Sequence, residues 1–378
     1  MRILHLYKDY FPVLGGIENH VRDLARMQVR RGHDVTVLVT GPAAQAVEED
    51  DAGVRVIKVP RMAVVASTPL SIDFYAHVRR LESDVTHVHV PYPVAETAQR
   101  FLGRTGRVVL TYHSDVVRQR GLLTLYAPIL RHVLSQADAI IATSAPYVQS
   151  SPFLRPVADK TVVVPLGIDP ARFREPDADA VERLRAQLGG RDSVLFVSVG
   201  RLRYYKGLDV AIRALAAVPG ARLVLVGSGP MEAEWRALSI TLGVADRVVF
   251  AGEIGDDELP LWFAAGDVYL SSASHRSEAF GISILEGMAS GRAVISTELG
   301  TGTSFINRHG VSGLVVPAGD VDALAGAMST LRDDAILRRD MGEAGRARVE
   351  REFTLERMTD RVLEVYAGRT PEPVDPAT

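Results

Sequence analysis

The stretch SVLFVSVG at residues 193–200 decides the fold class, because it is an apolar run of strand length that ends in glycine. Runs of the same kind recur on both sides of it, for example RILHLY at 2–7, VTHVHV at 85–90 and RLVLVG at 222–227. They are continuously apolar rather than alternating, as expected for parallel strands that are covered on both faces. The segments between them show helical spacing. The sequence therefore predicts an α/β protein with parallel sheets.

The strand pattern starts again at residue 194, which indicates two domains of similar construction. A usual size of about 150 residues per domain gives the same number for this chain. The stretch VPLGIDPARFREPDADA at 164–180 is rich in Pro, Asp and Gly and is a predicted linker. We therefore predict two tandem Rossmann-like domains, over residues 1–168 and 169–354. Such sheets bind ligands beyond the carboxyl ends of their strands, so we expect the site in a cleft between the domains.

Composition excludes several functional classes. The chain has 378 residues and no cysteine, which rules out disulfides, cysteine nucleophiles and zinc–thiolate sites. A net charge of −3 gives no reason to expect nucleic-acid binding. The chain starts with MRILHLYKDYFP, whose apolar run ends at Lys8 and is too short for a signal peptide. No other apolar run reaches the roughly 18 residues of a membrane helix. We expect a soluble, cytoplasmic protein that at most lies on a membrane surface.

Two polar segments are predicted to lack regular structure. The acidic run EEDD at 48–51 is expected to be a solvated loop before the strand that starts at 54. The end of the chain, residues 371–378, is expected to be a disordered tail.

In the first half, three sets of residues are candidates for binding. Gly15 and Gly16 precede a predicted helix, where they can let backbone N–H groups approach an anion or can form an ordinary tight turn. His113 follows a strand and is either catalytic or a satisfied histidine in the core or at its rim. His87 and His89 share one face of a strand, but no carboxylates or further histidines are expected near them, so no metal is predicted.

The second half places cations directly after its first strand. Arg201 and Lys206 flank a short loop, and two cations there suit a diphosphate, unless the loop is simply solvated. Gly227 and Gly229 form another turn, which can approach a phosphate or can simply reverse the chain. The backbone near Ile254, after a further strand, can contact the edge of a nucleotide base.

Two glutamates flank a predicted helix start in SEAFGISILEG, residues 277–287. Glu278 lies in the loop before the helix that begins near Gly281, and Glu286 lies in its second turn. Eight helical residues would separate their Cα atoms by about 12 Å. A retaining hydrolase needs its carboxyl groups about 5 to 5.5 Å apart, so the spacing fits an elongated ligand with one acid at each end. Two solvated surface glutamates are the alternative.

Taken in order, these motifs resemble the retaining glycosyltransferases of the GT-B fold, in particular family 4. The resemblance covers nearly the whole chain. It is carried by these stretches: GGIE at 15–18, HSD at 113–115, VGRLRYYKG at 199–207, VGSGP at 226–230 and EAFGISILEGMASGRAVIST at 278–297.

The resemblance implies a role for each candidate residue. Arg201 and Lys206 would hold the donor diphosphate, Glu286 the ribose and Glu278 the donor sugar. Backbone at Phe280, Gly281 and Ile282 would reach the sugar or phosphate. Gly15 and Gly16 would close over the phosphates, and His113 would lie near the transferred sugar. The helix within residues 355–370 would cross back onto the first domain.

The implied reaction is retaining transfer of a hexose from a nucleotide-diphosphate sugar to a glycan or lipid-linked acceptor. GDP-mannose is favoured as donor, and UDP-hexoses stay open. No cofactor and no metal are expected. A phosphorylase or hydrolase of the same fold and a non-catalytic nucleotide-sugar sensor are the competing interpretations.

Contact with a membrane surface is a further hypothesis. Arg100, Arg104 and Arg107 lie beside Phe101, and the apolar stretch VVRQRGLLTLYAPILRHVL follows at 116–134. Basic residues beside apolar ones can bind anionic lipid. A helix that faces the core and has solvated ends is the alternative.

Overall fold

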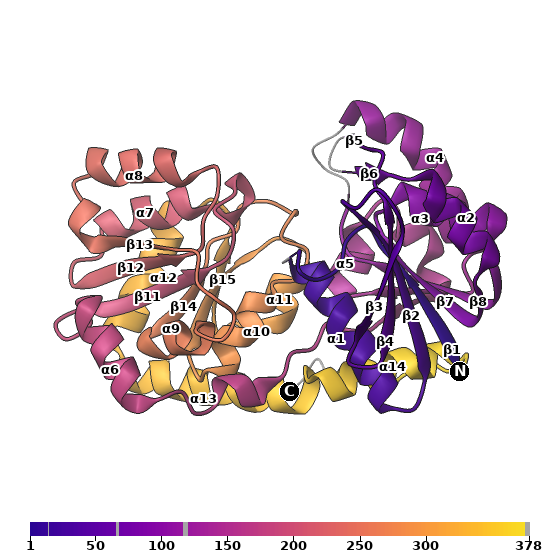
Figure 1. Ribbon diagram of the computed structural model, residues 1–378. Helices are drawn as coiled ribbons and strands as arrows, with labels where there is room; N and C mark the ends of the chain where they lie inside the picture. Colours follow the sequence, from indigo (N-terminus) through magenta and orange to yellow (C-terminus); the bar gives the residue numbers. More distant parts are fainter. Residues whose placement is uncertain (14, 66–67, 116–119, 375–378) are drawn as a thin grey trace. The chain divides into compact units, whose positions relative to one another are not determined.

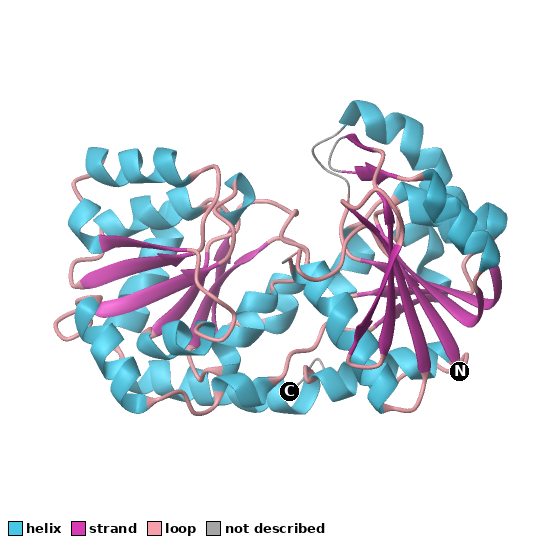
Figure 2. Cartoon of the chain, in the orientation of Figure 1, coloured by secondary structure: helices cyan, strands magenta, loops and turns pink. Residues whose placement is uncertain are grey.

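The chain folds into two compact units in the computed structural model, which describes residues 1–13, 15–65, 68–115 and 120–374 (Figure 1). Unit 1 comprises Met1–Gly167 together with the C-terminal segment from Leu355. Unit 2 is the uninterrupted stretch Ile168–Thr354. In each unit, helices cover a central sheet (Figure 2).

The main sheet of unit 1 has the strand order β10-β9-β8-β7-β1-β2-β4-β3. Its strands are β1 Arg2–Leu6, β2 Asp34–Gly41, β3 Val47–Asp51, β4 Val54–Pro60, β7 Glu82–Val90, β8 Arg104–Tyr112, β9 Ala139–Ala142 and β10 Thr161–Val163. A small antiparallel hairpin is formed by β5 Ala63–Val65 and β6 Thr68–Leu70. The helices are α1 Gly16–Arg30, α2 Ile72–Arg80, α3 Pro93–Leu102, α4 Arg120–Gln136, α5 Ala145–Ser150 and α14 Leu355–Tyr366, with the 3-10 helix η1 Arg155–Lys160.

The sheet of unit 2 is parallel throughout, in the order β13-β12-β11-β14-β15-β16. Its strands are β11 Val194–Val199, β12 Ala221–Val226, β13 Val248–Gly252, β14 Val268–Ser271, β15 Ala293–Glu298 and β16 Gly313–Pro317. Its helices are α6 Ala178–Gln187, α7 Leu208–Ala216, α8 Glu232–Thr241, α9 Leu259–Ala265, α10 Ile282–Ala289, α11 Gly302–Ile306, α12 Val321–Asp333 and α13 Ala335–Glu352. The 3-10 helices are η2 Pro170–Phe173, η3 Tyr204–Lys206 and η4 Ala245–Arg247.

The core follows the predicted pattern. The central strands of unit 2 are buried almost along their whole length, as Phe196 of β11 and Leu223 of β12 illustrate. Helix α1 of unit 1 buries Val21, Leu24 and Ala25 on one face, which is the helical spacing read from the sequence. The predicted α/β class with parallel sheets is confirmed in both units.

One prediction about local structure is wrong. The acidic run at 48–51 is not a loop but most of strand β3, which pairs antiparallel with β4 at the edge of the sheet. Glu48 and Glu49 form ion pairs across the two strands with Arg55 and Lys58, at 2.7 and 2.6 Å. Charged edge strands are common because they discourage pairing with other chains. No apolar alternation marks this strand, since almost all of its side chains are exposed.

The last helix belongs to unit 1, although the chain reaches it from unit 2. Helix α14 packs against α1 and β8 and buries Met358, Val362 and Tyr366. After it, Pro371 and Val374 are buried in irregular backbone, and residues 375–378 of the predicted tail lie outside the described residues. Among the described residues, no helix is both long and apolar enough to cross a membrane.

Candidate functional site

The candidate donor site lies at the switch point of the unit 2 sheet, between the neighbouring strands β11 and β14. The sheet grows from β11 through β12 to β13 in one direction and from β14 through β15 to β16 in the other. Loops that leave the carboxyl ends of two such strands diverge and open a crevice for ligands. Arg201 and Lys206 follow β11, and the two glutamates follow β14, so four predicted residues come from these two connections.

The loop after β11 brings Lys206 back over its own backbone. Gly200 has a φ of +139°, and a Cβ at this position would lie 3.1 Å from the Lys206 Nζ. The missing side chain therefore leaves room for the lysine. Arg201, the next residue, is exposed to solvent.

Lys206 and Glu278 form an ion pair, with Nζ 2.8 Å from Oε2. Their side chains are only 16% and 11% exposed. Burial alone would lower the pKa of Lys206, but the charge of Glu278 and the neighbouring tyrosines raise it above its usual value. The lysine is therefore a fixed cation at neutral pH, and its partner is an acid that can also accept hydrogen bonds from hydroxyl groups.

Helix α10 begins directly after this pair with a glycine that has left-handed backbone. Gly281 is the N-cap residue, with φ +96° and no side-chain cap. Phe280 before it is buried, and Ile282 is the first residue of the helix. The first N–H groups of the helix therefore have no side-chain acceptor, and the helix dipole makes this end attractive to anions.

Glu286 lies in the second turn of α10, as predicted from the sequence. Burial raises the pKa of its carboxyl to about 7, and the charge of Arg172 opposes that rise. Arg172 belongs to η2 and donates a hydrogen bond to the Asp256 carbonyl oxygen at 3.0 Å. Asp256 lies in the coil after β13 that also carries Ile254. The sequence reasoning missed Arg172, because it assigned that stretch to a linker.

The glycines of the turn after β12 have a packing role. Gly227 has a φ of +124°, and a Cβ there would lie 2.3 Å from the Gly200 carbonyl oxygen. A Cβ at Gly229 would lie 2.5 Å from the Leu202 carbonyl oxygen. Both glycines are therefore needed for two neighbouring loops to approach each other. This packing role does not depend on the predicted contact of Gly229 with a phosphate.

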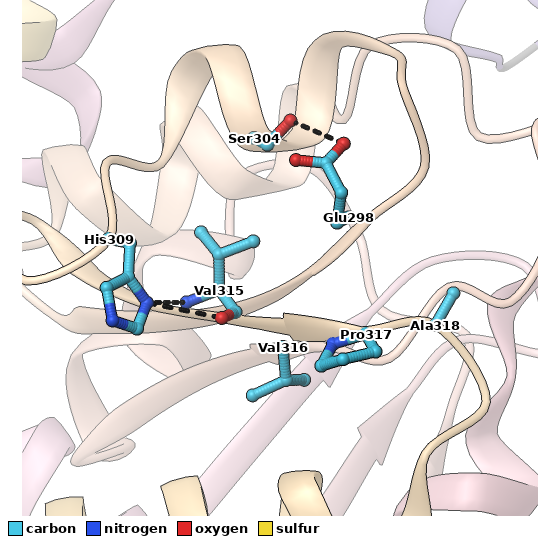
Figure 3. Close-up of a pocket in the computed structure, with 7 residues that line it drawn as sticks. All are labelled: Glu298, Ser304, His309, Val315, Val316, Pro317 and Ala318. Carbon is cyan, nitrogen blue, oxygen red and sulfur yellow. Dashed lines mark hydrogen bonds between the residues drawn. The ribbon is translucent and has the colours of Figure 1, made fainter.

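The loop after β15 supports the loop before α10. Thr301 donates its hydroxyl to the Glu278 carbonyl oxygen at 2.9 Å, and the Gly302 N–H donates to Ala279 at 2.9 Å. A shallow pocket of about 700 Å³ lies next to this loop along the edge strand β16 (Figure 3). Glu298 accepts a hydrogen bond from Ser304 in its wall, at 2.9 Å. None of the predicted site residues lines this pocket.

In unit 1, the Gly15–Gly16 turn leads into α1 without a side-chain cap. The backbone of Gly15 is extended, with a φ of −178°, so its conformation does not require glycine. The Glu18 carboxylate lies over it, since a Cβ at Gly15 would be 2.2 Å from Oε2. Lys8 lies 3.8 Å from the other oxygen of Glu18.

His113 follows β8 and joins a buried group of five histidines, here called the histidine cluster. Its members are His5, His20, His87, His89 and His113. Burial is the main reason why the pKa of every member is lowered, to about 4 for His5 and about 3 for His20. The expectation that no further histidines lie near His87 and His89 is therefore wrong. The others come from β1, α1 and the loop after β8, and no local sequence pattern reveals that they meet.

Comparison with known proteins identifies the family. Residues 14–172 match the family described as Glycosyltransferase Family 4, and residues 181–348 match Glycosyl transferases group 1. The chain is 37% identical to O-antigen chain mannosyltransferase C of Escherichia coli, over 97% of this chain and 98% of the relative. The chain belongs to glycosyltransferase family 4. The predicted enzyme class is thereby confirmed.

Other relatives of this glycosyltransferase also match over nearly their whole length. D-rhamnosyltransferase WbpZ of Pseudomonas aeruginosa is 37% identical over 94% of this chain and 92% of the relative. A GDP-mannose-dependent alpha-(1-6)-phosphatidylinositol monomannoside mannosyltransferase of Mycobacterium tuberculosis is 30% identical, over 97% and 98%.

Solved structures confirm the fold of this glycosyltransferase. Sucrose-phosphate synthase from Thermosynechococcus elongatus superposes with a TM-score of 0.81 at 23% identity, over 97% of this chain and 98% of that one. Anabaena HepE, solved in complex with UDP, has a TM-score of 0.78 at 22% identity, over 97% and 100%. The predicted two-domain GT-B architecture is therefore confirmed, while the roles of individual site residues stay predictions.

Proposed function

We propose that this glycosyltransferase moves mannose from GDP-mannose to a glycan or lipid-linked acceptor in the synthesis of a cell-surface glycan. Among the relatives that match over nearly their full length, one is named an O-antigen chain mannosyltransferase and another a GDP-mannose-dependent mannosyltransferase. UDP-hexose transfer is the second candidate, because a solved neighbour of the same fold is described as a complex with UDP-glucose.

The Lys206–Glu278 ion pair at the switch point is the observation that carries the proposal. A donor diphosphate would take the Lys206 ammonium, the exposed Arg201 guanidinium and the uncapped N-terminus of α10. Glu278 would then accept hydrogen bonds from the donor sugar. A carboxylate and an ammonium that already lie 2.8 Å apart are close enough to contact the sugar and the phosphate of one donor.

The rest of the donor would extend along α10 and past the end of β13. Glu286 would accept the ribose hydroxyls, and the backbone at Ile254 would contact the base. Phe280, Gly281 and Ile282 would offer their backbone to the sugar and phosphate. In unit 1, His113 would contact the transferred sugar, and the turn at Gly15 and Gly16 would approach the diphosphate.

The chemistry requires that charge on the leaving diphosphate be stabilised while the bond to the sugar breaks. Preorganised cations and helix N-termini do this best where water is excluded. A hydrogen bond to a charged group contributes about 1.5 to 3 kcal/mol, so Lys206 and Arg201 could supply what a metal supplies elsewhere. Transfer with retention and without a metal is part of the proposal.

The first test is a calorimetric titration with GDP, UDP, ADP, GDP-mannose and UDP-glucose. We expect GDP and GDP-mannose to bind and Lys206→Met to weaken binding about 10- to 150-fold. Lys58→Met is the matched control, because Lys58 also pairs with an acid, Glu49, but lies in unit 1. Binding of UDP but not of GDP would indicate that the donor is a UDP-hexose and not GDP-mannose. A folded protein that binds no nucleotide would contradict the assignment.

Turnover separates an enzyme from a nucleotide-sugar sensor. We expect release of mannose from GDP-mannose with the anomeric configuration retained, as followed by proton NMR on freshly formed product. Inversion would overturn the retaining mechanism. Tight binding without any turnover, in the presence of extracts that contain acceptors, would favour the sensor. Full activity after treatment with EDTA is expected, and a loss that Mg²⁺ restores would contradict the metal-free mechanism.

We also propose that unit 1 contacts anionic lipid through an exposed patch on α3 and α4. The patch consists of Arg100, Phe101, Leu125, Ile129 and His132. Phe101, Leu125 and Ile129 are 69%, 75% and 42% exposed, and the Arg100 Nε donates to His132 across the two helices at 3.1 Å. Apolar side chains next to basic ones are typical of interfacial binding. The positions 116–119 of the predicted stretch lie outside the described residues.

A flotation assay tests this contact. We expect binding to vesicles that contain anionic lipid, and loss of binding in Leu125→Asp. Ile240→Asp is the control, because Ile240 is 69% exposed on α8 of unit 2. Equal behaviour of both variants, or no binding by the wild type, would contradict the proposal.

A further inference from the structure

The histidine cluster forms part of a continuous chain of buried hydrogen bonds within unit 1. The contacts are, in order, His113 Nε2 to His89 Nδ1 (3.0 Å), His89 Nε2 to His5 Nδ1 (3.0 Å), His5 Nε2 to Gln28 Oε1 (2.7 Å), Gln28 Nε2 to Tyr366 Oη (3.2 Å), Tyr366 Oη to His87 Nδ1 (2.6 Å) and His87 Nε2 to Thr111 Oγ1 (2.5 Å). Gln28 lies at its centre, on α1, and Tyr366 lies on α14.

A neutral imidazole has one donor nitrogen and one acceptor nitrogen. Burial lowers the pKa of all four histidines in the chain, so each is neutral at pH 7. Each ring that engages both nitrogens must therefore donate with one and accept with the other. The direction of one hydrogen bond then fixes the direction of all the others.

Gln28 supplies this direction, because an amide oxygen can only accept and an amide nitrogen can only donate. Since Oε1 faces His5, the His5 proton lies on Nε2, and its Nδ1 accepts from the His89 Nε2–H. His89 Nδ1 then accepts from the His113 Nε2–H. His113 is left with a bare Nδ1.

The second arm of the chain continues from the same orientation of the Gln28 amide. Gln28 Nε2–H donates to Tyr366, whose hydroxyl proton is then free for His87 Nδ1. His87 in turn donates from Nε2 to Thr111. Turning the amide around by itself would place like groups face to face in both arms, and a buried unsatisfied polar group costs about 1 to 3 kcal/mol. The amide can therefore turn only if all six bonds reverse together, which would move the His113 proton from Nε2 to Nδ1.

We propose that Gln28, oriented with Oε1 toward His5, fixes His113 as the tautomer with a bare Nδ1, so that His113 recognises its ligand as a hydrogen-bond acceptor. The ligand group must then be a hydroxyl that donates its proton. That this hydroxyl belongs to the donor sugar rests on the proposed function. Gln28 and Tyr366 are positioning residues, because they act on His113 only through His5 and His89.

A transition metal is the competing use of the same residues. His20, His89 and His113 have ring nitrogens within 4.8 Å of one another, and so do His5, His87 and His89. Neither ring nitrogen of the buried His20 has a hydrogen-bond partner in the part of the chain that the structure describes. A metal on His89 Nδ1 and His113 Nε2 would need both nitrogens bare, whereas the chain places a proton between them. The two arrangements therefore differ in the protonation of His113.

Nitrogen NMR of the full-length protein, labelled with ¹⁵N in its histidines and without nucleotide, tests the chain. We expect His5, His87, His89 and His113 to carry their protons on Nε2, with the His113 signals assigned by loss in His113→Gln. In Gln28→Met and Tyr366→Phe the direction is no longer imposed, so His113 should become a mixture of tautomers. Tyr92→Phe is the control, because Tyr92 is equally buried in unit 1 but donates to the Pro69 carbonyl oxygen, outside the chain.

Three results would overturn the proposal. One is a proton on Nδ1 of His113 in the wild type. Another is a single unchanged His113 tautomer in both variants, which a circular dichroism spectrum must show to be folded. The third is the finding that His89 Nδ1 and His113 Nε2 both lack a proton and that a proton appears between them after treatment with EDTA. That result would show that the histidine cluster binds a metal.

Kinetics then link the tautomer to the ligand. We expect Gln28→Met to lower kcat/KM for GDP-mannose about 2- to 12-fold, the range for one neutral hydrogen bond, while its affinity for GDP, which has no sugar to transfer, stays unchanged. An unchanged kcat/KM, or an equal loss for GDP, would contradict the role in sugar recognition. If the wild type lacks turnover, the proposed function is wrong. The tautomer of His113 is still decided by the NMR measurement, because that measurement requires neither nucleotide nor turnover.

Discussion

At the scale of single residues, the most informative contact is the Lys206–Glu278 ion pair. The two residues were predicted as a diphosphate ligand and a sugar ligand. Their mutual contact implies that a diphosphate bound as proposed has to compete with Glu278 for the ammonium. One residue of the pair is therefore expected to favour nucleotide binding and the other to oppose it.

This competition leads to a prediction for Glu278→Gln. The variant should bind GDP as tightly as the wild type or up to about tenfold more tightly, because about 1.4 kcal/mol of competing interaction is removed. Turnover of GDP-mannose should nevertheless fall, since the sugar loses a charged acceptor. Calorimetry and a coupled assay of GDP release measure the two effects. A loss of GDP affinity as large as that of Lys206→Met would show that the pair acts as one ligand.

The raised pKa of Glu286 leads to a prediction for the pH dependence of nucleotide binding. Its carboxyl has a pKa raised to about 7 by burial, and only the ionised form can accept hydrogen bonds from two ribose hydroxyls without donating one. Affinity for GDP should therefore be constant above about pH 8 and fall by up to tenfold for each pH unit below 7. Glu286→Gln should bind more weakly at pH 8 and lose this dependence. A wild-type affinity that does not change between pH 6 and 8 would contradict the assignment.

Sequence reasoning grouped those candidate site residues that lie in contiguous motifs. Lys206 and Glu278 lie in the connections that follow β11 and β14, and Glu286 lies in the helix that ends the second connection, so the order of strands, loops and helices is enough to group them. The partners of His113 follow no such pattern. Gln28 and Tyr366 are separated by 338 positions, and only the folded chain brings them together.

At the scale of elements, local sequence predicted the buried strands and failed where a strand is solvated. Strand β11 is marked by a run of apolar residues, because helices cover both faces of its sheet. Strand β3 is held by backbone pairing and by exposed ion pairs to β4, which leave no apolar pattern. The 3-10 helix η2 was also missed, because it lies in a stretch whose proline and aspartates are typical of a loop.

The turn that ends the loop after β11 gives an element-scale prediction. Gly207 has a φ of +61°, and a Cβ there would lie 2.1 Å from the Ser272 carbonyl oxygen. Gly207→Ala should lower the free energy of unfolding by at least about 1 to 2 kcal/mol, since the left-handed backbone alone costs that much, and it should weaken GDP binding by displacing Lys206. Gly255→Ala is the control, because Gly255 has open space and no positive φ. Equal melting temperatures for the two variants would contradict this account.

At the scale of the whole molecule, the two units should respond differently to acid. The pKa of each member of the histidine cluster is lowered, so below pH 6.5 the unfolded state of unit 1 binds more protons than the folded state. Stability is therefore full above about pH 7 and is lost as the pH falls toward the folded pKa values, by up to about 1.4 kcal/mol per histidine and pH unit. Unit 2 contains only His275 and His309.

Hydrogen exchange followed by mass spectrometry checks this difference. Between pH 7 and pH 5.5, and after correction for the intrinsic exchange rate, peptides from α1 and β7 should lose far more protection than peptides from β11 and β14. His20→Gln should reduce the loss in unit 1, because it removes the histidine whose ring nitrogens lack partners among the described residues. Equal losses in both units would contradict the prediction.

The return of the last helix to unit 1 has a consequence for how the protein is made. Unit 2 is uninterrupted, so all of it has been translated once Thr354 has left the ribosome. Unit 1 begins at the first residue but still lacks α14, and with it the Tyr366 hydroxyl that holds Gln28 and His87. Domains usually complete their folding in the order of synthesis. Here the half that is translated first is expected to be completed last, after the final helix emerges. A nascent chain from which Thr354 but not α14 has left the ribosome would contain a finished unit 2 and an unfinished histidine core in unit 1.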